Sequence, residues 1–166
     1  QYGIAYISID CAGQSTLSFE GSTITGLLPA DAHSGRYSFW SNRGDESNMN
    51  LTREFDFTDV SGKIEFTYAT WYDIEEDWDY LYLEVSEDGK TWEMIQTPSG
   101  TDTDPTGQNY GWAFTGQTSG WIEETVDLSA YAGKKVQLRF EYVTDAAVNG
   151  EGLLLDDVRI DAVDYS

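Results

Sequence analysis

Apolar and polar residues alternate with a period of two along most of this chain, as residues Tyr80 to Ser86 (YLYLEVS) show. Successive side chains of a β-strand point to opposite faces, so this period predicts strands. We expect Leu81, Leu83 and Val85 to face the core, with the intervening tyrosines and Glu84 partly exposed.

The same alternation recurs at intervals, and helical spacing is rare. It predicts an all-β fold, a two-sheet antiparallel sandwich of the jelly-roll type, as a single domain over residues 1–166. The expected strands are Ile4–Ile9, Thr16–Glu20, Gly35–Ser41, Asn50–Phe57, Lys63–Tyr72, Tyr80–Ser86, Trp92–Gln96, Trp121–Leu128, Val136–Val143 and Leu153–Asp161.

Two connections are predicted with more detail. The sequence Glu87-Asp88-Gly89-Lys90 predicts a tight hairpin after YLYLEVS, because glycine readily adopts the left-handed conformation that such turns require. The stretch from Thr97 to Ser119 contains two prolines and several glycines, so we expect a long loop. Long loops in compact domains are often binding elements or mobile flaps.

Charge and composition restrict the partners. A formal charge of −21 and a pI near 4.1 disfavour nucleic acids and anionic membranes, which would be repelled. No segment has the ~20 apolar residues that a membrane span needs, so we expect no membrane insertion. Cys11 is the single cysteine, so no internal disulfide can stabilise the fold. The opening Gln1-Tyr2-Gly3 is neither an initiator methionine nor a signal peptide, and we expect a domain excised from a longer, processed protein.

Catalytic motifs are sparse. His33 is the single histidine, and we expect it in a surface turn; HExxH, CxxC, Walker and GxGxxG motifs are absent from the sequence. Paired carboxylates could still support a small glycosidase or lyase, since that chemistry needs only two acids ~5–9.5 Å apart. We expect a protein that is not an enzyme.

An acidic segment, WYDIEEDWDY, occupies residues 71–80. Asp73, Glu75, Asp77 and Asp79 could share a pocket for a cation such as Ca²⁺, which takes six to eight oxygen ligands. The default interpretation is a solvated acidic edge that discourages strand pairing, with Trp78 anchoring the corner.

The terminal segment LLLDDVRI, residues 153–160, raises a similar question. Simple alternation places Asp156 on the face of Leu154, Val158 and Ile160, and therefore inward if that face is the core. A buried carboxylate needs a cation or several hydrogen-bond donors. Both alternatives remain open for Asp156.

Exposed aromatic rings flanked by polar groups can stack on sugars. Trp71 and Tyr72 are adjacent, so one of them should face the core. Trp92 and Trp121 are expected to pack at strand starts. The candidates for glycan contact are Trp40, Trp71, Trp78, Tyr82, Tyr110 and Trp112.

Three stretches, FEGS (19–22), DAHSGRYSFWS (31–41) and LLLDDVRI (153–160), resemble segments of jelly-roll carbohydrate-binding modules and MAM-like domains. In those families these segments hold one structural calcium. The resemblance implies side-chain ligands from Glu20 and from Asp156 or Asp157, and carbonyl ligands near His33, Ser34 and Arg36.

The stretches SNRGDESNMNLTREFDF, WYDIEEDWDYLYLEVSEDGKTW, GWIEETVDLSAYAGKKVQLRFEYVTD and GEGLLLDDVRI extend the likeness over residues 16–161. Together they are similar to the accessory jelly-roll domain of immune inhibitor A-like secreted bacterial metallopeptidases. The zinc motif of that family's catalytic domain is missing, so the resemblance implies a noncatalytic, secreted or cell-surface module.

We therefore expect a calcium-stabilised module that mediates adhesion or substrate contact, through a glycan or a cell-surface or protein partner. The alternative is a spacer domain that supports a neighbouring metallopeptidase in a larger chain and binds no small ligand. The third hypothesis is the small glycosidase or lyase.

Overall fold

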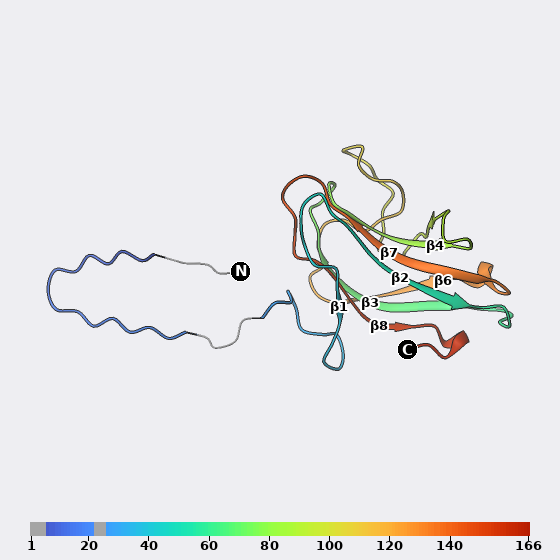
Figure 1. The fold of residues 1–166 in the computed structure, drawn as a ribbon, viewed down its shortest axis with the longest axis horizontal. Helices are drawn as coiled ribbons and strands as arrows, with labels where there is room; N and C mark the ends of the chain where they lie inside the picture. The colour runs from blue at the N-terminus through green and yellow to red at the C-terminus, as the bar shows by residue number, and fades with distance from the viewer. Residues whose placement is uncertain (1–5, 22–25) are drawn as a thin grey trace.

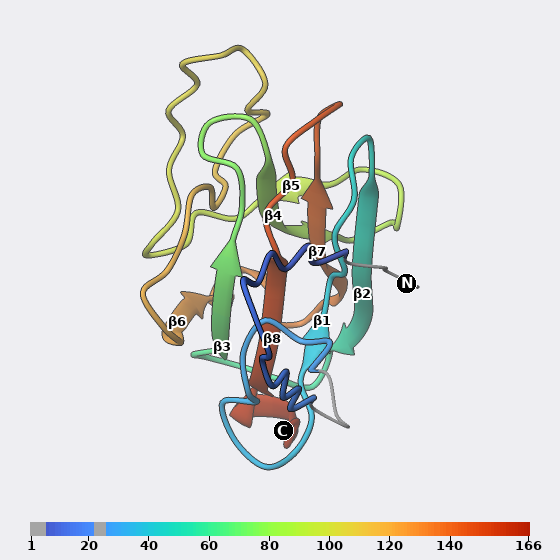
Figure 2. The ribbon, with the colours of Figure 1, turned by 90° about the vertical axis from the view of Figure 1, so that its left-hand side faces the viewer.

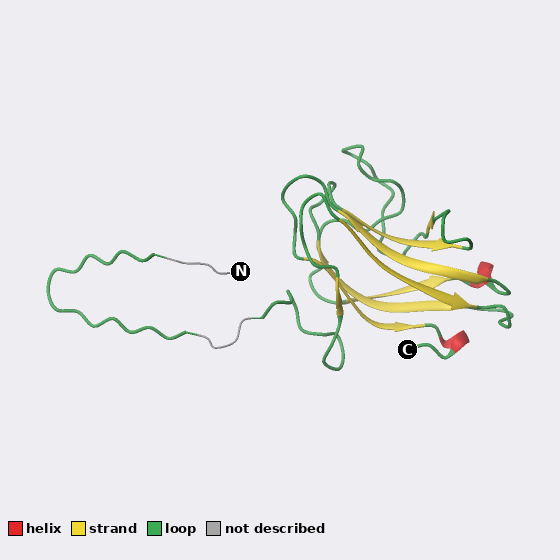
Figure 3. Cartoon of the chain, in the orientation of Figure 1, coloured by secondary structure: helices red, strands yellow, loops and turns green. Residues whose placement is uncertain are grey.

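The computed structural model describes residues 6–21 and 26–166. Within these ranges, strands form two antiparallel four-stranded sheets that lie face to face (Figures 1 and 3). The predicted two-sheet jelly-roll sandwich is confirmed. The first sheet has the order β1 (Phe39–Trp40), β8 (Gly152–Arg159), β3 (Glu65–Asp73) and β6 (Ile122–Asp127), which can be followed across the front of Figure 2. The second has the order β2 (Asn48–Asp56), β7 (Lys135–Val143), β4 (Tyr80–Ser86) and β5 (Glu93–Met94).

The core lies between the sheets and is built by the predicted alternation. Leu81, Leu83 and Val85 of β4 belong to the main apolar cluster, as expected. The expectation that Glu84 and the tyrosines of this strand are partly exposed is wrong, because all seven residues of β4 are buried. The predicted long loop folds back over this strand, where Phe114 forms a β-bridge with Leu81.

Predicted and observed strand limits agree best for β4 and β7, the central strands of the second sheet. Tyr80–Ser86 is reproduced, and the strands that pack beside it shift by one or two residues. Gly35–Ser41 shortens to Phe39–Trp40, and Trp92–Gln96 shortens to Glu93–Met94. The hairpin is confirmed, with Gly89 at a φ of 68°. Two short 3-10 turns, η1 (Ser129–Tyr131) and η2 (Asp161–Val163), complete the regular structure of the described residues.

The two strands predicted before residue 21 are not found in the described residues. Residues 4 and 5 lie outside the described ranges, and residues 6–21 form no strand and are exposed. Figure 1 shows this segment as a loop that extends away from both sheets. Period-two alternation makes a strand only where a sheet edge offers hydrogen bonds, and this segment meets none.

A β-bulge in β8 corrects the prediction for Asp156. The register with β3 shifts between the pairs Ala69–Asp156 and Thr67–Arg159, and Asp157 has a φ of 46°. The extra residue lets both Leu155 and Val158 pack into the core. Asp156 therefore points away from the core, opposite to Leu155, and does not share the face of Val158.

In the described part of the chain, no helix is long and apolar enough to cross a membrane.

Candidate metal centre

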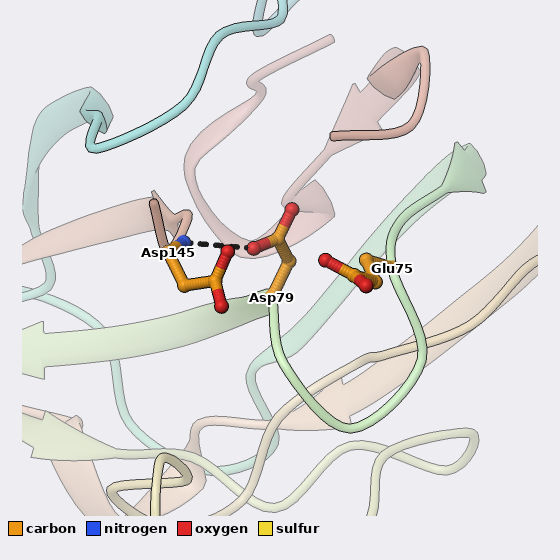
Figure 4. Close-up of side chains that lie close together, drawn as sticks. All are labelled: Glu75, Asp79 and Asp145. Atoms are coloured by element: carbon orange, nitrogen blue, oxygen red, sulfur yellow. Dashed lines mark hydrogen bonds between the residues drawn. The ribbon is translucent and has the colours of Figure 1, made fainter. Parts of the chain in front are cut away.

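Three acidic side chains converge at one end of the sandwich. Glu75, Asp79 and Asp145 each offer a carboxylate oxygen, and these oxygens lie within 4.8 Å of one another (Figure 4). Glu75 and Asp79 come from the loop between β3 and β4, whereas Asp145 follows β7. The pairing of Tyr80 with Val143 places the ends of β4 and β7 side by side, which brings Asp79 and Asp145 together. We call these three residues the acidic trio.

Asp79 is the buried member of the acidic trio, with 0% of its surface exposed. Its Oδ1 accepts the backbone N–H of Asp145 at 2.9 Å, and its Oδ2 accepts the hydroxyl of Tyr142 at 3.3 Å. Burial raises the pKa of Asp79 to about 6, although both hydrogen bonds oppose the change. The loss of hydration therefore disfavours the ionised carboxylate more than its two hydrogen bonds stabilise it.

The carboxylate of Glu75 is also in an environment that disfavours its ionised form. Its Oε2 is buried and has no hydrogen-bond partner in the structure. Burial raises the pKa of Glu75, and the negative charges of Asp145 and Asp45 raise it further. Among the described residues, no lysine, arginine or histidine forms an ion pair with the acidic trio. No cationic side chain of residues 6–21 or 26–166 therefore neutralises the negative charge here.

The chemistry of this ligand set suits a hard divalent cation. Three carboxylates from two separate segments can supply several of the oxygens that Ca²⁺ takes, and that ion tolerates irregular geometry. Asp45, between β1 and β2, lies close enough for its charge to raise the pKa of Glu75 as well. The acidic trio can thus hold a metal ion.

The sequence predicted part of this arrangement. Glu75 and Asp79 were both candidates, but Asp73 and Asp77 are not in the trio. The default interpretation of a solvated edge is wrong for Asp79, which is buried. Asp145 was missed, because it is 66 residues away from Asp79 along the chain. Pairing YLYLEVS with QLRFEYV in register would have revealed it.

A second acidic region lies at the terminal strand. His33 Nδ1 lies 2.7 Å from Oδ2 of Asp157, and the Ser34 hydroxyl donates to Oδ1 of Asp157 at 2.5 Å. The Ser34 backbone N–H donates to Oδ2 of Asp156 at 3.1 Å. The hydroxyl of Ser34, then the ring of His33, lowers the pKa of Asp157. We call these four residues the terminal-strand cluster.

Both aspartates of the terminal-strand cluster accept hydrogen bonds, and the binding of a cation by Asp156 stays a prediction. Oδ1 of Asp156 accepts the Asp157 backbone N–H at 2.8 Å, so all four carboxylate oxygens have a partner. Arg36 is exposed close by, whereas Glu20 lies on the exposed segment that extends away from the sheets. The structure brings four of the six resemblance-derived residues together and leaves Glu20 apart.

The aromatic candidates lie on both sheets: Trp40 and Trp71 flank one residue of the first sheet, and Tyr110 stacks on Tyr82 of the second. Trp40 and Trp71 both pair with Leu154 across the first sheet and are half-buried, whereas Tyr72 is in the core. Trp112 is half-buried and Tyr82 is buried. Trp78 and Tyr110 are the exposed members, with 43% and 68% of their surfaces accessible.

Comparisons with known proteins agree on one family. The family described as "Immune inhibitor A-like, MAM domain" matches residues 13–164. The pre-pro-metalloprotease PrtV of Vibrio cholerae is 34% identical over 138 residues, which cover 83% of this chain and 14% of that protein. Immune inhibitor A of Bacillus thuringiensis is 33% identical over 129 residues, 76% of this chain and 17% of that protein.

Bacillopeptidase F of Bacillus subtilis is 31% identical over 118 residues, 70% of this chain and 7% of that protein. The chain thus spans a small part of each of these relatives. A solved structure, TmCBM61 in complex with beta-1,4-galactotriose, is similar with a TM-score of 0.47 and 16% identity, covering 78% of this chain and 73% of that one.

Proposed function

Because the chain belongs to the immune inhibitor A-like MAM domain family, we propose that it is a noncatalytic, calcium-stabilised module of a secreted or cell-surface protein. In this role it contacts a glycan, a protein substrate or a neighbouring domain. The observation that carries the calcium part is the acidic trio, in which a fully buried Asp79 and a buried, unpartnered oxygen of Glu75 face Asp145.

A calcium ion would remove the electrostatic cost of this arrangement. Both carboxylates with a raised pKa lie in the loop before β4, and their ionised forms are disfavoured by burial. A divalent cation favours the ionised forms and bridges two chain segments, β3–β4 and the end of β7. Its binding energy would therefore add directly to the stability of the sandwich.

A second calcium at the terminal-strand cluster is the proposal that follows from the resemblance. Asp156 and Asp157 would provide side-chain oxygens, with carbonyl oxygens of His33, Ser34 and Arg36. Glu20 would have to approach from the N-terminal segment. The support for this ion is the meeting of residues 33–34 with residues 156–157.

The alternative role is a spacer that supports a neighbouring metallopeptidase and binds no small ligand. One observation favours it: the matching part is 14% of a protein named a metalloprotease, so most of that relative lies outside this domain. No contact in the described residues favours the third hypothesis, a glycosidase or lyase, over these two.

The deciding experiment is a metal titration. Protein stripped with chelator and checked by elemental analysis should bind Ca²⁺ in isothermal titration calorimetry, and its melting temperature should rise with Ca²⁺ concentration. Stabilisation follows RT ln(1 + [L]/Kd), or about 2.7 kcal/mol at a hundredfold excess over Kd. An identical melt with and without Ca²⁺ in verified metal-free protein would disprove the calcium role and leave the spacer role.

A further inference from the structure

The outer face of the second sheet carries an ordered set of polar and aromatic side chains that the calcium role does not use. Strands β2, β7 and β4 turn alternate residues outward, opposite to Leu138, Phe140 and the other core residues. The pairing register sets Tyr82, Glu141 and Asn50 in one row across the sheet. Glu84, Arg139 and Thr52 form the next row.

The polar part of this face is held in one fixed arrangement. Arg139 Nη2 lies 2.6 Å from Glu84 Oε2 and 2.9 Å from Glu141 Oε2. The other oxygen of Glu141 accepts the Asn48 side-chain amide at 2.6 Å. Asn50 in turn donates its amide to Asn48 at 2.5 Å. These ion pairs and hydrogen bonds form a continuous series from the buried Glu84 to the exposed side-chain amides of Asn48 and Asn50.

Two stacked tyrosines lie beside these polar side chains. Tyr110 stacks on Tyr82, with ring centroids 5.8 Å apart and an interplanar angle of 16°. The Tyr82 hydroxyl accepts the backbone N–H of Tyr110 at 3.0 Å and donates to the Asn109 side chain at 3.3 Å. One face of the Tyr110 ring is thus fixed against Tyr82, yet 68% of the residue is exposed.

A second aromatic ring, that of Trp92, lies beside the same series of polar side chains. Trp92, just before β5, lies with its ring 4.0 Å from the guanidinium carbon of Arg139. The loop that holds Tyr110 reaches this strand, because a side chain at Gly111 would collide with the sulfur of Met94 in β5. Trp92 thus contacts Arg139 directly, and Tyr110 is connected to the same group through Tyr82, which pairs with Glu141 across the sheet. We call Tyr110, Trp92, Arg139, Glu141, Asn48 and Asn50 the platform.

We propose that the platform binds a neutral, hydroxyl-rich oligosaccharide, with the Tyr110 ring stacked on a sugar ring and Asn50, Asn48 and Glu141 hydrogen-bonded to its hydroxyls. This proposal deepens the contact role proposed above and rests on it. A flat, rigid ring loses little conformational entropy on binding, and amides and carboxylates in fixed positions match hydroxyl groups that both donate and accept.

Charge decides the class of glycan. Arg139 is already neutralised by two carboxylates, so the platform has no free cation to offer an anionic sugar. The formal charge of −21 on the whole chain also repels sulfated or uronic polymers. A neutral saccharide is the partner that this surface fits.

The test measures binding of cellohexaose, laminarihexaose and chitohexaose by calorimetry, with hexagalacturonate as the anionic comparison. At least one neutral probe should bind, and amide chemical shifts should change around residues 48–50, 82–84, 109–111 and 139–141. Tyr110→Ala should weaken binding about five- to tenfold, and Tyr110→Phe should retain it. Trp78→Ala is the matched control, because Trp78 is also exposed but lies on another loop.

Several results would overturn the proposal. These are no binding of any neutral hexamer at millimolar concentration, equal losses for Tyr110→Ala and Trp78→Ala, shift changes confined to other faces, or preference for hexagalacturonate. The melting temperature of every variant with and without Ca²⁺ is recorded in the same series. A calcium response that persists while sugar binding fails would thus reject the platform without rejecting the calcium role.

Discussion

Asp79 and Asp145 are joined through the backbone: Oδ1 of Asp79 accepts the N–H of Asp145 at 2.9 Å, although the two are 66 residues apart. This bond fixes the end of β7 beside the loop that precedes β4. It also holds the Asp145 side chain close to a buried carboxylate of the same charge, as Figure 4 shows. The fold therefore imposes the repulsion that a cation would relieve.

Replacing Asp79 by asparagine tests this interpretation. The amide oxygen of the new side chain can still accept the Asp145 N–H, so the metal-free Asp79→Asn protein should be as stable as the wild type or more stable. The stabilisation by Ca²⁺ that the acidic trio provides should be lost, which calorimetric melts with and without the ion would show. A loss of the full increment is about 2–3 kcal/mol at a hundredfold excess of Ca²⁺ over the wild-type Kd.

Glu76→Gln is the control for charge, since Glu76 is exposed on the same loop and is not in the acidic trio. It should keep the calcium increment. If both variants lose the increment equally, the ion responds to general charge and the acidic trio is not its site.

Arg139 should be essential for stability, because it pairs with a buried acid. The Glu84 side chain is 5% exposed and that of Arg139 is 20% exposed. Arg139→Met removes the partner and leaves a buried, unpaired carboxylate, which should lower the free energy of unfolding by about 3 kcal/mol. Urea denaturation at neutral pH measures this change.

The double variant Arg139→Met with Glu84→Gln should recover most of that loss, since the most buried charge is removed and Glu141, whose side chain is 16% exposed, keeps its hydrogen bond from Asn48. Lys63→Met is the exposed comparison: its partner Glu65 has a side chain that is 47% exposed, and solvent screening should make the change in stability far smaller than that of Arg139→Met. Failure of the double variant to recover stability would show that packing on Trp92, and not charge, explains the effect.

Asp88 should make the hairpin between β4 and β5 sensitive to acid. Its Oδ1 accepts the backbone N–H groups of Thr91 and Lys90 at 2.7 and 2.8 Å. These bonds, first from Thr91 and then from Lys90, lower the pKa of Asp88 to about 2. A carboxyl with a lowered folded-state pKa stabilises the fold above its ordinary value of 3.8, and this contribution is lost as the pH falls toward 2.

Asp88→Asn keeps an acceptor oxygen and cannot ionise. The stability advantage of the wild type over this variant should therefore be present at pH 5 and should shrink steadily between pH values of about 4 and 2. Urea unfolding of both proteins across this pH range measures the difference in their free energies of unfolding. The titration of the other carboxylates contributes almost equally to both proteins and largely cancels in this difference. A difference that is constant with pH would contradict the assignment.

Asp157 should hold the loop around His33 against the terminal strand. Both of its carboxylate oxygens are occupied by His33 and Ser34. Asp157→Ala should free this loop, and trypsin should then cleave faster after the exposed Arg36. Cleavage followed by mass spectrometry measures the rate, and Asp161→Ala, an exposed acid of η2, is the control.

The same assay bears on the second calcium ion. Ca²⁺ should slow cleavage after Arg36 in the wild type and have no effect in Asp157→Ala. If Ca²⁺ leaves both rates unchanged while the acidic trio still responds, one ion binds this domain and the terminal-strand cluster is purely hydrogen-bonded.

The sequence predicted the limits of β4 and β7, the central strands of the second sheet, to within one residue at each end. In β4, period-two alternation and the Gly89 turn together determine the limits. Residues 16–20 show the same alternation, yet they form no strand, because a local pattern does not specify whether a sheet edge will accept it. The burial of Tyr80 and Tyr82 was equally out of reach, since it depends on where the long loop folds.

The candidate site was predicted in part for similar reasons. Glu75 and Asp79 are close in sequence and were identified as acids that could share a pocket. Asp145 joins them only through the pairing of β4 with β7, which is a long-range property. For Asp156, the prediction from period-two alternation failed, because a β-bulge at Asp157 inserts one extra residue into the strand. The sequence pattern does not show this bulge, which the structure marks by the positive φ of Asp157.

The extra residue of this β-bulge divides β8 into two segments. Odd-numbered residues face the core before it, and even-numbered residues face the core after it. Leu153 and Leu155 set the phase before it, and Val158 and Ile160 set the phase after it. Deleting this one residue would restore a regular ladder with the leucines and the final apolar pair still inward, whereas inserting a further residue would turn one of the two pairs into water. The terminal strand should consequently tolerate the loss of one residue at this point far better than it tolerates the gain of one.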